Sequence, residues 1–161
     1  MSVLFGVLLP NLVKKRQWQK HLLIISQTRF GKECLRELRK MSPSEFERYI
    51  ADLFQKFGYQ TNVVGKSHDG GLDVEIEKDG KKGYIQCKKY KDKKVDVHAV
   101  RDFYGAIADI SNGENYFITT SLLTLEAKKY SEDKPFELVD GSKLIEYILL
   151  TEKEAEDISH F

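Results

Sequence analysis

The sequence predicts an α/β protein, a mixed β-sheet flanked by helices, with the element order αβββαβ followed by an added αβα. Apolar residues recur at helical spacing in some segments and alternate with polar residues in others, and an Asp-Gly pair joins two of the alternating segments. The chain has 161 residues, of which 41% are hydrophobic, so it is long enough for one domain with a real core and an appendage.

The first helix of this domain is predicted over residues 44–57. Four apolar residues recur on one face of this segment, at i, i+4, i+7 and i+11: Phe46, Ile50, Leu53 and Phe57. At about 100° per residue, Glu47 lies on the flank of that face and can point toward the sheet, whereas Glu45 points away. Ser44 and Glu47 also have the spacing of a capping box, which leaves a second role open for this glutamate. A strand over 60–64 is expected to follow.

A β-hairpin is predicted next, over residues 72–89. Apolar and acidic residues alternate in 72–78, and an alternating pattern continues in 83–89, as half-buried strands require. Asp79-Gly80 between them is typical of a two-residue type I′ turn.

The turn fixes the register of the two strands. Lys78 is expected to pair with Lys81, and counting back places Asp73 directly opposite Gln86, with Lys88 as its diagonal neighbour. Directly opposed Cβ atoms lie about 4.5–5.5 Å apart. We therefore expect a carboxylate, an amide oxygen and an ammonium group to converge on one exposed patch.

The second half of the chain alternates between helices and strands. The predicted elements are a helix over 97–110, a strand over 115–119, a helix over 124–131, a strand over 136–139 and a helix over 142–150. Cys34 and Cys87 form no metal or disulfide pattern, which favours a reducing, cytoplasmic location over secretion.

The polar residues of the hairpin suit a divalent-metal site. Mg²⁺ prefers hard oxygen ligands and keeps several waters, so the Asp73 carboxylate and the Gln86 amide oxygen fit it. Lys88 can then lower the pKa of a metal-bound water, orient that water, or neutralise charge on a phosphate under attack. The alternative is an amphipathic hairpin with a solvated polar face.

Several motifs around the hairpin occur together in a known family. They are Ser44-Glu45-Phe46-Glu47, Phe57-Gly58-Tyr59, Asp69-Gly70-Gly71-Leu72-Asp73, Gln86-Cys87-Lys88-Lys89-Tyr90, Asn115-Tyr116-Phe117-Ile118-Thr119-Thr120-Ser121 and Leu138-Val139-Asp140-Gly141. From about Met41 to Ile148 the chain resembles the Mrr-like branch of the PD-(D/E)XK nuclease superfamily, found among type IV restriction endonucleases. Gln86 replaces the acidic residue of the usual Glu-x-Lys element, and this replacement is characteristic of the Mrr-like branch.

The resemblance implies a restriction-endonuclease-like core and a set of site residues. The implied catalytic residues are Asp73, Gln86, Lys88 and Glu47. The implied ligands of a Mg²⁺ ion, for which Mn²⁺ can substitute, are Asp73, Gln86, Glu47 and the backbone carbonyl of Cys87.

A lysine cluster surrounds the proposed site, with two tyrosines interleaved. Its members are Lys81, Lys82, Lys88, Lys89, Lys91, Lys93 and Lys94, with Tyr84 and Tyr90. Lysines beside a hydrolytic site would hold a phosphate backbone without reading bases. The residues expected to bind DNA are Lys89, Tyr90, Lys91, Lys93 and Lys94.

We expect three parts along the chain: a basic N-terminal extension over 1–40, a nuclease domain over 41–150 and a tail over 151–161. The extension has nine basic and two acidic residues, 9 − 2 = +7, and the remainder carries 17 − 23 = −6. Such an arm suits a polyanion. Its apolar run 3–13 is too short to cross a bilayer of about 30 Å as a helix. We interpret the arm as a packing or dimer-forming extension, with interfacial membrane attachment as the alternative.

These observations predict a Mg²⁺-dependent DNA endonuclease that hydrolyses phosphodiester bonds, in restriction of foreign or modified DNA or in DNA repair. The alternatives are a structure-selective nuclease that cuts Holliday junctions, and a non-catalytic nucleic-acid-binding module on a nuclease fold. The expected partner is DNA, with a possible homodimer and no membrane.

Overall fold

The structure is a computed structural model that describes residues 28–65 and 71–159, the last seven of them by backbone alone. The apolar run 3–13 and the Asp69-Gly70 start of one motif lie outside the described residues. In chain order the elements are α3 (Arg29–Lys40), α4 (Pro43–Lys56), β1 (Gln60–Val63), β2 (Val74–Lys78), β3 (Lys81–Lys88), α5 (Val97–Ile107), β4 (Tyr116–Thr119), α6 (Leu125–Ser131), β5 (Glu137–Val139) and α7 (Gly141–Ser159).

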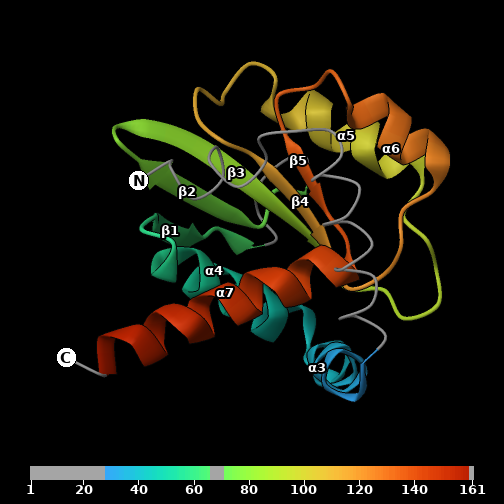
Figure 1. The fold of residues 1–161 in the computed structure, drawn as a ribbon. Coiled ribbons are helices and arrows are strands. Elements are labelled where there is room, and N and C mark those ends of the chain that lie inside the picture. The colour runs from blue at the N-terminus through green and yellow to red at the C-terminus, as the bar shows by residue number, and fades with distance from the viewer. Residues whose placement is uncertain (1–27, 66–70, 160–161) are drawn as a thin grey trace.

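The described strands form one sheet in the order β1-β2-β3-β4-β5 (Figure 1). β1, β2 and β3 are antiparallel, whereas β4 runs parallel to both β3 and β5. From α4 onward the elements follow the order αβββαβ and then αβα. The predicted fold class, a mixed sheet flanked by helices, is confirmed.

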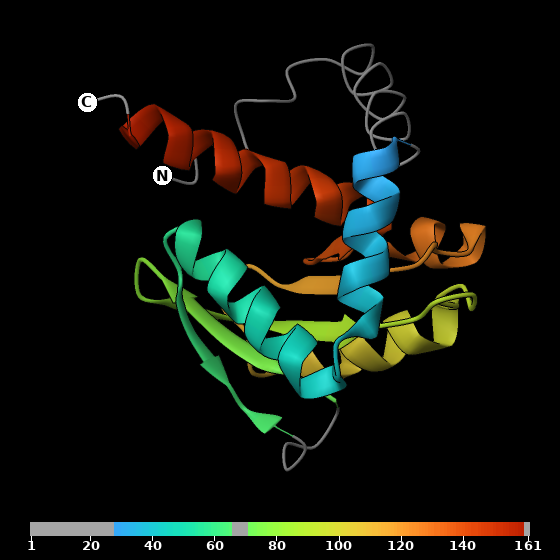
Figure 2. The ribbon, with the colours of Figure 1, turned by 90° about the horizontal axis from the view of Figure 1, so that it is seen from below.

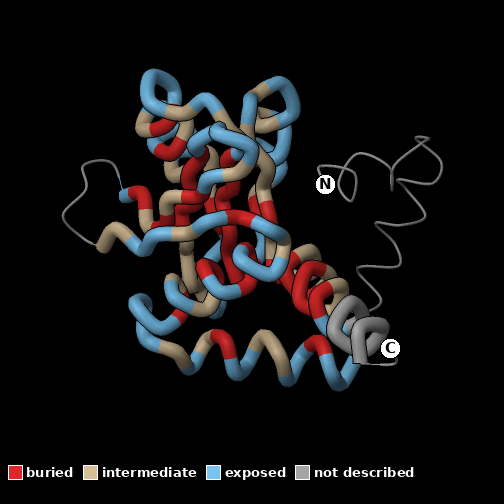
Figure 3. The backbone as a smooth tube through the Cα atoms, turned by 90° about the vertical axis from the view of Figure 1, so that its left-hand side faces the viewer, coloured by how far each residue is buried: buried red, intermediate tan, exposed pale blue. Residues whose placement is uncertain are grey.

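Each face of the sheet has its own hydrophobic core. On one face α4 and α7 pack over alternating strand residues that include Val74, Ile85 and Ile118. On the other face α5 and α6 cover Tyr84 and Phe117. Figure 2 shows α4, α7 and α3 on the first side, and Figure 3 shows the buried backbone concentrated between the layers.

The helix α4 begins earlier than predicted. Its N-cap is Ser42, whose amide donates to Glu45 Oε2 at 2.6 Å while the Glu45 amide donates to Ser42 Oγ at 3.2 Å. Pro43 suits the first helical position because its φ is fixed and it has no amide hydrogen to satisfy. The capping box therefore joins Ser42 to Glu45, and the predicted box between Ser44 and Glu47 is wrong.

The hairpin turn has the predicted type and register. Asp79 and Gly80 have φ values of 54° and 73°, the left-handed conformations that a type I′ turn requires. Lys78 pairs with Lys81, and the pairing continues to Val74. β2 begins only at Val74, two residues later than predicted.

Two helix ends also differ from prediction. α5 ends at Ile107 because the following turn folds back on β3, where the amides of Asn112 and Gly113 both donate to the Lys82 carbonyl, at 3.1 and 2.8 Å. α7 continues to Ser159 through the segment predicted as a tail, since no proline or glycine interrupts it. In the described ranges no helix is long and apolar enough to cross a membrane.

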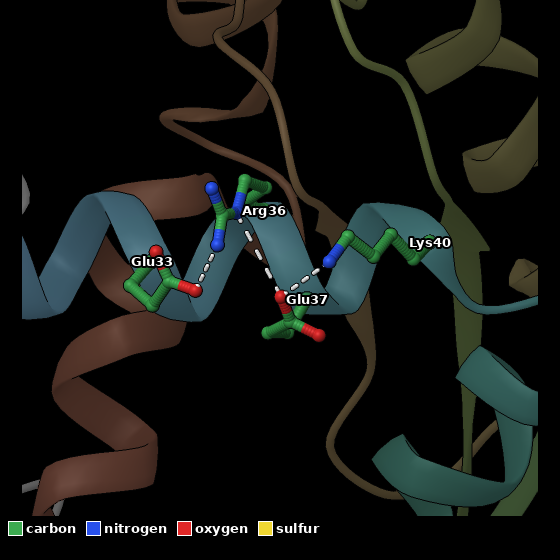
Figure 4. Close-up of polar contacts among 4 residues, drawn as sticks. All are labelled: Glu33, Arg36, Glu37 and Lys40. Atoms are coloured by element: carbon green, nitrogen blue, oxygen red, sulfur yellow. Dashed lines mark hydrogen bonds and ion pairs between the residues drawn. The ribbon is translucent and has the colours of Figure 1, made fainter.

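A further helix, α3, lies within the segment predicted as a basic extension. Leu38 on its inner side is only 3% exposed and belongs to the core shared with α4 and α7. Its outer side carries a ladder of exposed ion pairs among Glu33, Arg36, Glu37 and Lys40 (Figure 4). Exposed pairs of this kind contribute little stability, but they neutralise part of the positive charge of the helix.

Candidate active site

A β-bulge lies at Asp73, directly before the first residue of β2. The Asp73 amide donates to the Ile85 carbonyl at 2.9 Å, although the register partner of Ile85 is Val74. Two residues of one strand therefore face one residue of the other, which defines a bulge, and bulges occur often beside active sites. The predicted placement of Asp73 directly opposite Gln86 is corrected accordingly.

The Asp73 carboxylate takes the place of a backbone partner in the ladder. The amide of Cys87 donates to Asp73 Oδ2 at 2.7 Å. This hydrogen bond fixes the carboxylate in the plane of the sheet, between the ends of β2 and β3. A side chain that substitutes for a ladder acceptor explains why regular pairing stops at Val74.

Four influences act on the Asp73 carboxyl. Burial is the largest, and together with the neighbouring Glu47 it raises the pKa of Asp73 to about 6, although the Cys87 amide and Lys88 oppose the rise. Two carboxyl groups that share a site resist simultaneous ionisation. The structure thus brings Asp73, Glu47, Lys88 and the Cys87 backbone together.

Glu47 reaches the site because the helix cap does not use it. Its neighbour Glu45 takes the capping role, and Glu47 lies half-buried one position beyond the buried Phe46. The helical position predicted for Glu47, on the flank of the apolar stripe and facing the sheet, agrees with this interaction.

Gln86 lies in a more buried environment than the sequence indicated. Its side chain is only 5% exposed, because α5 and α6 cover the sheet face on which Tyr84 lies. A Cβ atom built on Gly71 would lie 2.9 Å from Gln86 Nε2, so the glycine leaves space for this amide. Gln86 Oε1 is buried and has no hydrogen-bond partner. The expectation that Gln86 lies on an exposed patch is therefore wrong, and its amide nitrogen lies beside Gly71.

Lys88 lies at the end of β3, half-buried and in register with Thr119 of β4. β3 and β4 are parallel and end at the same edge of the sheet, and β2, antiparallel to β3, begins there. The bulge, Lys88 and the loops after β3 and β4 therefore share one edge.

Lys89, predicted to bind DNA, is engaged within the fold. Its Nζ donates to the Arg39 carbonyl at the end of α3, at 3.0 Å. The Arg39 guanidinium in turn donates to the Thr120 carbonyl at 2.6 Å, and Thr120 Oγ1 donates to the Tyr90 carbonyl at 2.7 Å. This chain of hydrogen bonds ties α3 to the two loops at the active-site edge.

The other predicted DNA-binding residues differ in exposure. Lys91, Lys93 and Lys94 are exposed, whereas Tyr90 is half-buried and packs against the core beneath α5. The Lys93 ammonium lies 5.5 Å from the centre of the Tyr90 ring, within cation–π range. The three exposed lysines are placed where a polyanion can reach them.

Arg39 and Thr120 were missed as contributors to this edge. The signal was the helical spacing of Cys34, Leu35 and Leu38 within the basic segment, which predicts a helix with a buried side. Thr120 belongs to one of the motifs of the resemblance, but its contact with Arg39 could not be predicted, because the two residues are far apart in the sequence.

The oxygen ligands at the bulge fit a divalent cation. Burial is the main cause of the raised pKa of Asp73, and Glu47 adds a repulsion that a cation between the two carboxyl groups would relieve. The unpartnered Gln86 Oε1 is a further hard donor. No three His, Cys, Asp or Glu side chains converge within the described ranges, so any ion would also need amide, backbone and water oxygens, as Mg²⁺ commonly does.

Comparison with known proteins identifies the family of this chain. Residues 38–148 match a family model described as a restriction endonuclease, the Mrr catalytic domain. The chain belongs to this restriction endonuclease family. It is also 33% identical over 129 residues to the type IV methyl-directed restriction enzyme EcoKMrr of Escherichia coli (strain K12). That match covers 74% of this chain and 42% of the enzyme, so this Mrr-like chain spans less than half of its relative. The resemblance predicted over Met41 to Ile148 is confirmed.

Two solved structures share the fold. The DNA modification-dependent restriction endonuclease AspBHI superposes with a TM-score of 0.57 at 18% identity, over 72% of this chain and 34% of that one. A protein of unknown function, AF1548, superposes with a TM-score of 0.53 at 22% identity, over 60% of this chain and 56% of that one. The restriction-endonuclease-like core is therefore confirmed at the level of fold.

Proposed function

We propose that this Mrr-like protein is a Mg²⁺-dependent endonuclease that hydrolyses phosphodiester bonds of DNA, in restriction of foreign or modified DNA or in DNA repair. The observation that carries the proposal is the Asp73–Glu47 carboxyl pair beside Lys88, held in a bulge at the sheet edge. Membership of the restriction endonuclease family supports the same activity.

Each site residue has a role in this proposal. Asp73, Glu47, Gln86 and the Cys87 carbonyl would hold the cation, which when bound supplies an acidified water and stabilises charge on the phosphate. The Cys87 amide fixes Asp73 Oδ2 at 2.7 Å and so orients the carboxylate before DNA arrives. Lys88 places positive charge beside Asp73, where it can orient the attacking water or bind a phosphate oxygen.

A metal-dependent cleavage assay tests the proposal. Supercoiled plasmid is incubated with the protein in Mg²⁺, Mn²⁺ or EDTA, and the products are separated on agarose. We expect nicked or linear DNA with either metal and none in EDTA. DNA binding without cleavage in every metal would support the non-catalytic module instead.

A substrate panel tests the choice between nuclease types. It contains linear, methylated, single-stranded and four-way-junction DNA of equal length. Cleavage of duplex DNA at rates at least equal to the junction supports restriction or repair of duplexes. Exclusive cleavage of the junction would assign the structure-selective alternative.

The proposal includes a cytoplasmic location and a homodimer. The cytoplasm is reducing and keeps thiols such as those of Cys34 and Cys87 free. Double-strand cleavage needs two sites, which a symmetric dimer would supply. Sedimentation with and without DNA measures the oligomeric state, and nicking by a monomer would contradict the dimer.

A further inference from the structure

Two exposed leucines lie after β4, one in the turn that follows the strand and one at the first position of α6. Leu122 is 52% exposed and Leu125 is 77% exposed, and they lie three residues apart. A single exposed leucine is ordinary on a protein surface, whereas a pair beside a functional edge calls for a physical reason.

The backbone that carries this pair is fixed. The Val95 amide donates to the Leu122 carbonyl at 2.9 Å, and the Thr124 amide donates to the Val95 carbonyl at 3.0 Å. Leu123, between them, is buried and forms a parallel bridge with Val95. Thr124 also caps α6. The two exposed side chains are therefore presented by an ordered turn, so little backbone entropy is lost when they bind.

The turn lies at the active-site edge of the sheet. Leu122 follows Thr119, the last residue of β4 and the register partner of Lys88. The hydrogen bonds to Val95 join the turn to the loop that follows Lys88 on β3. Figure 1 shows β3 and β4 ending at the same side of the sheet. The turn and Lys88 therefore lie at the same edge of the sheet.

Exposed lysines lie on both segments that border the leucine pair. The exposed charged residues of 91–94 and 125–129 are Lys91, Lys93, Lys94, Lys128 and Lys129, with Asp92 and Glu126. Their sum is 5 − 2 = +3. Ser121 Oγ donates to the Lys93 carbonyl at 2.8 Å, so the lysine loop is held against the turn. An apolar centre within a cationic rim suits DNA, which has apolar sugar and base surfaces between rows of phosphates.

We propose that Leu122 and Leu125 form an apolar wedge that enters the minor groove of duplex DNA beside the cleavage site. The inference rests on the proposed function and adds to it how the substrate is held. Leucine wedges unstack base steps in minor-groove binders, while neighbouring cations hold the phosphates. Pyrimidine–purine steps deform easily, so duplexes that contain them are the favoured substrates.

Three variants test the wedge. They are the double variant Leu122→Ala/Leu125→Ala, the single variant Leu125→Ala, and the control Ile110→Ala. Ile110 is 52% exposed, as Leu122 is, but lies at the other end of α5, beside the turn that contacts Lys82. All three positions are exposed, so each variant should fold, which circular dichroism checks.

Binding is measured in EDTA with a duplex that carries 2-aminopurine at a TA step, over a range of salt. We expect the double variant to bind about tenfold more weakly, a smaller loss than that of an interface hot spot, with an unchanged salt slope. The wild type should increase 2-aminopurine fluorescence, and the double variant should not. The variant Lys93→Ala/Lys94→Ala should instead reduce the salt slope by about 2.

The outcomes separate this inference from the proposed function. If the wild type cleaves DNA and both leucine variants bind it as Ile110→Ala does, the wedge is wrong and the nuclease stands. If the wild type neither binds nor cleaves DNA, the proposed function fails first. If the leucine variants change self-association in sedimentation and leave DNA affinity intact, the pair contacts a second copy and the wedge is overturned.

Discussion

Replacement of Asp73 by asparagine should stabilise the metal-free protein and abolish its activity. Burial and Glu47 raise the pKa of Asp73 to about 6, so the ionised carboxylate is held at a cost in the folded protein. Asparagine has no charge, and its Oδ1 atom can still accept the hydrogen bond from the Cys87 amide. The substitution therefore removes the electrostatic cost and keeps the contact.

The magnitude follows from the difference between folded and unfolded pKa values. The pKa rises from 3.8 to about 6, and each unit corresponds to about 1.36 kcal/mol. Because Asp73 is only partly buried, solvent screening reduces this to about 1–2 kcal/mol. The folded protein binds the Asp73 proton more tightly than the unfolded chain does. The contribution of protonated Asp73 to the free energy of unfolding is therefore fully present below pH 3.8 and is lost as the pH rises through about 6.

The assay is urea unfolding at pH 5 and pH 8, in EDTA and in Mg²⁺. In EDTA at pH 8 we expect the free energy of unfolding of Asp73→Asn to exceed that of the wild type by about 1–2 kcal/mol. The difference should be smaller at pH 5, where Asp73 of the wild type is largely protonated. Mg²⁺ should stabilise the wild type more than the variant, because the variant keeps only Glu47 of the two carboxylate ligands. Glu75→Gln, two residues along β2 and opposite Tyr84, is the matched control and should keep its Mg²⁺ response.

Two results would refute this reasoning. A variant that is less stable than the wild type in EDTA at pH 8 would show that the carboxylate is not under electrostatic strain. An equal gain in stability from Mg²⁺ in variant and wild type would exclude Asp73 as a ligand.

Local signals predicted the elements that local physics determines. Asp79-Gly80 favours left-handed backbone at two successive positions, so the turn type and the pairing of Lys78 with Lys81 followed from the sequence. The apolar stripe of α4 placed Glu47 on the correct side for the same reason, because helical geometry fixes which residues share a face.

Features that depend on distant partners could not be predicted in this way. Counting residues from the turn predicts that regular pairing continues beyond Val74. The bulge interrupts it, because the Asp73 carboxylate accepts the hydrogen bond of the Cys87 amide. Gln86 alternates with buried residues as an exposed residue would, yet it is buried on the sheet face that α5 and α6 cover, with Gly71 beside its amide. Tertiary packing decides such cases, since alternation specifies a face and not what covers it.

Three further predictions test the remaining parts of the structure. Lys88→Ala should reduce the cleavage rate far more than Lys91→Ala, because Lys88 lies beside Asp73 while the exposed Lys91 can act only on affinity. Equal losses of rate in single-turnover kinetics would show that Lys88 only contacts a phosphate. Gln86→Glu should destabilise the protein in EDTA, because a charge would be buried at a 5% exposed position, and Mg²⁺ should restore the stability of this variant. Calorimetry should show that Gln86→Leu binds metal weakly. Unchanged Mg²⁺ affinity in the leucine variant would exclude Gln86 as a ligand. Leu38→Ala should lower the free energy of unfolding by about 2–5 kcal/mol, because Leu38 packs in the core, whereas Lys40→Ala on the exposed side of the same helix should change it by less than about 0.5 kcal/mol. Two equally small changes in urea unfolding would instead show that α3 is dispensable and that the domain begins at Met41, while the expected difference would make α3 part of the fold that holds Lys89 at the active-site edge.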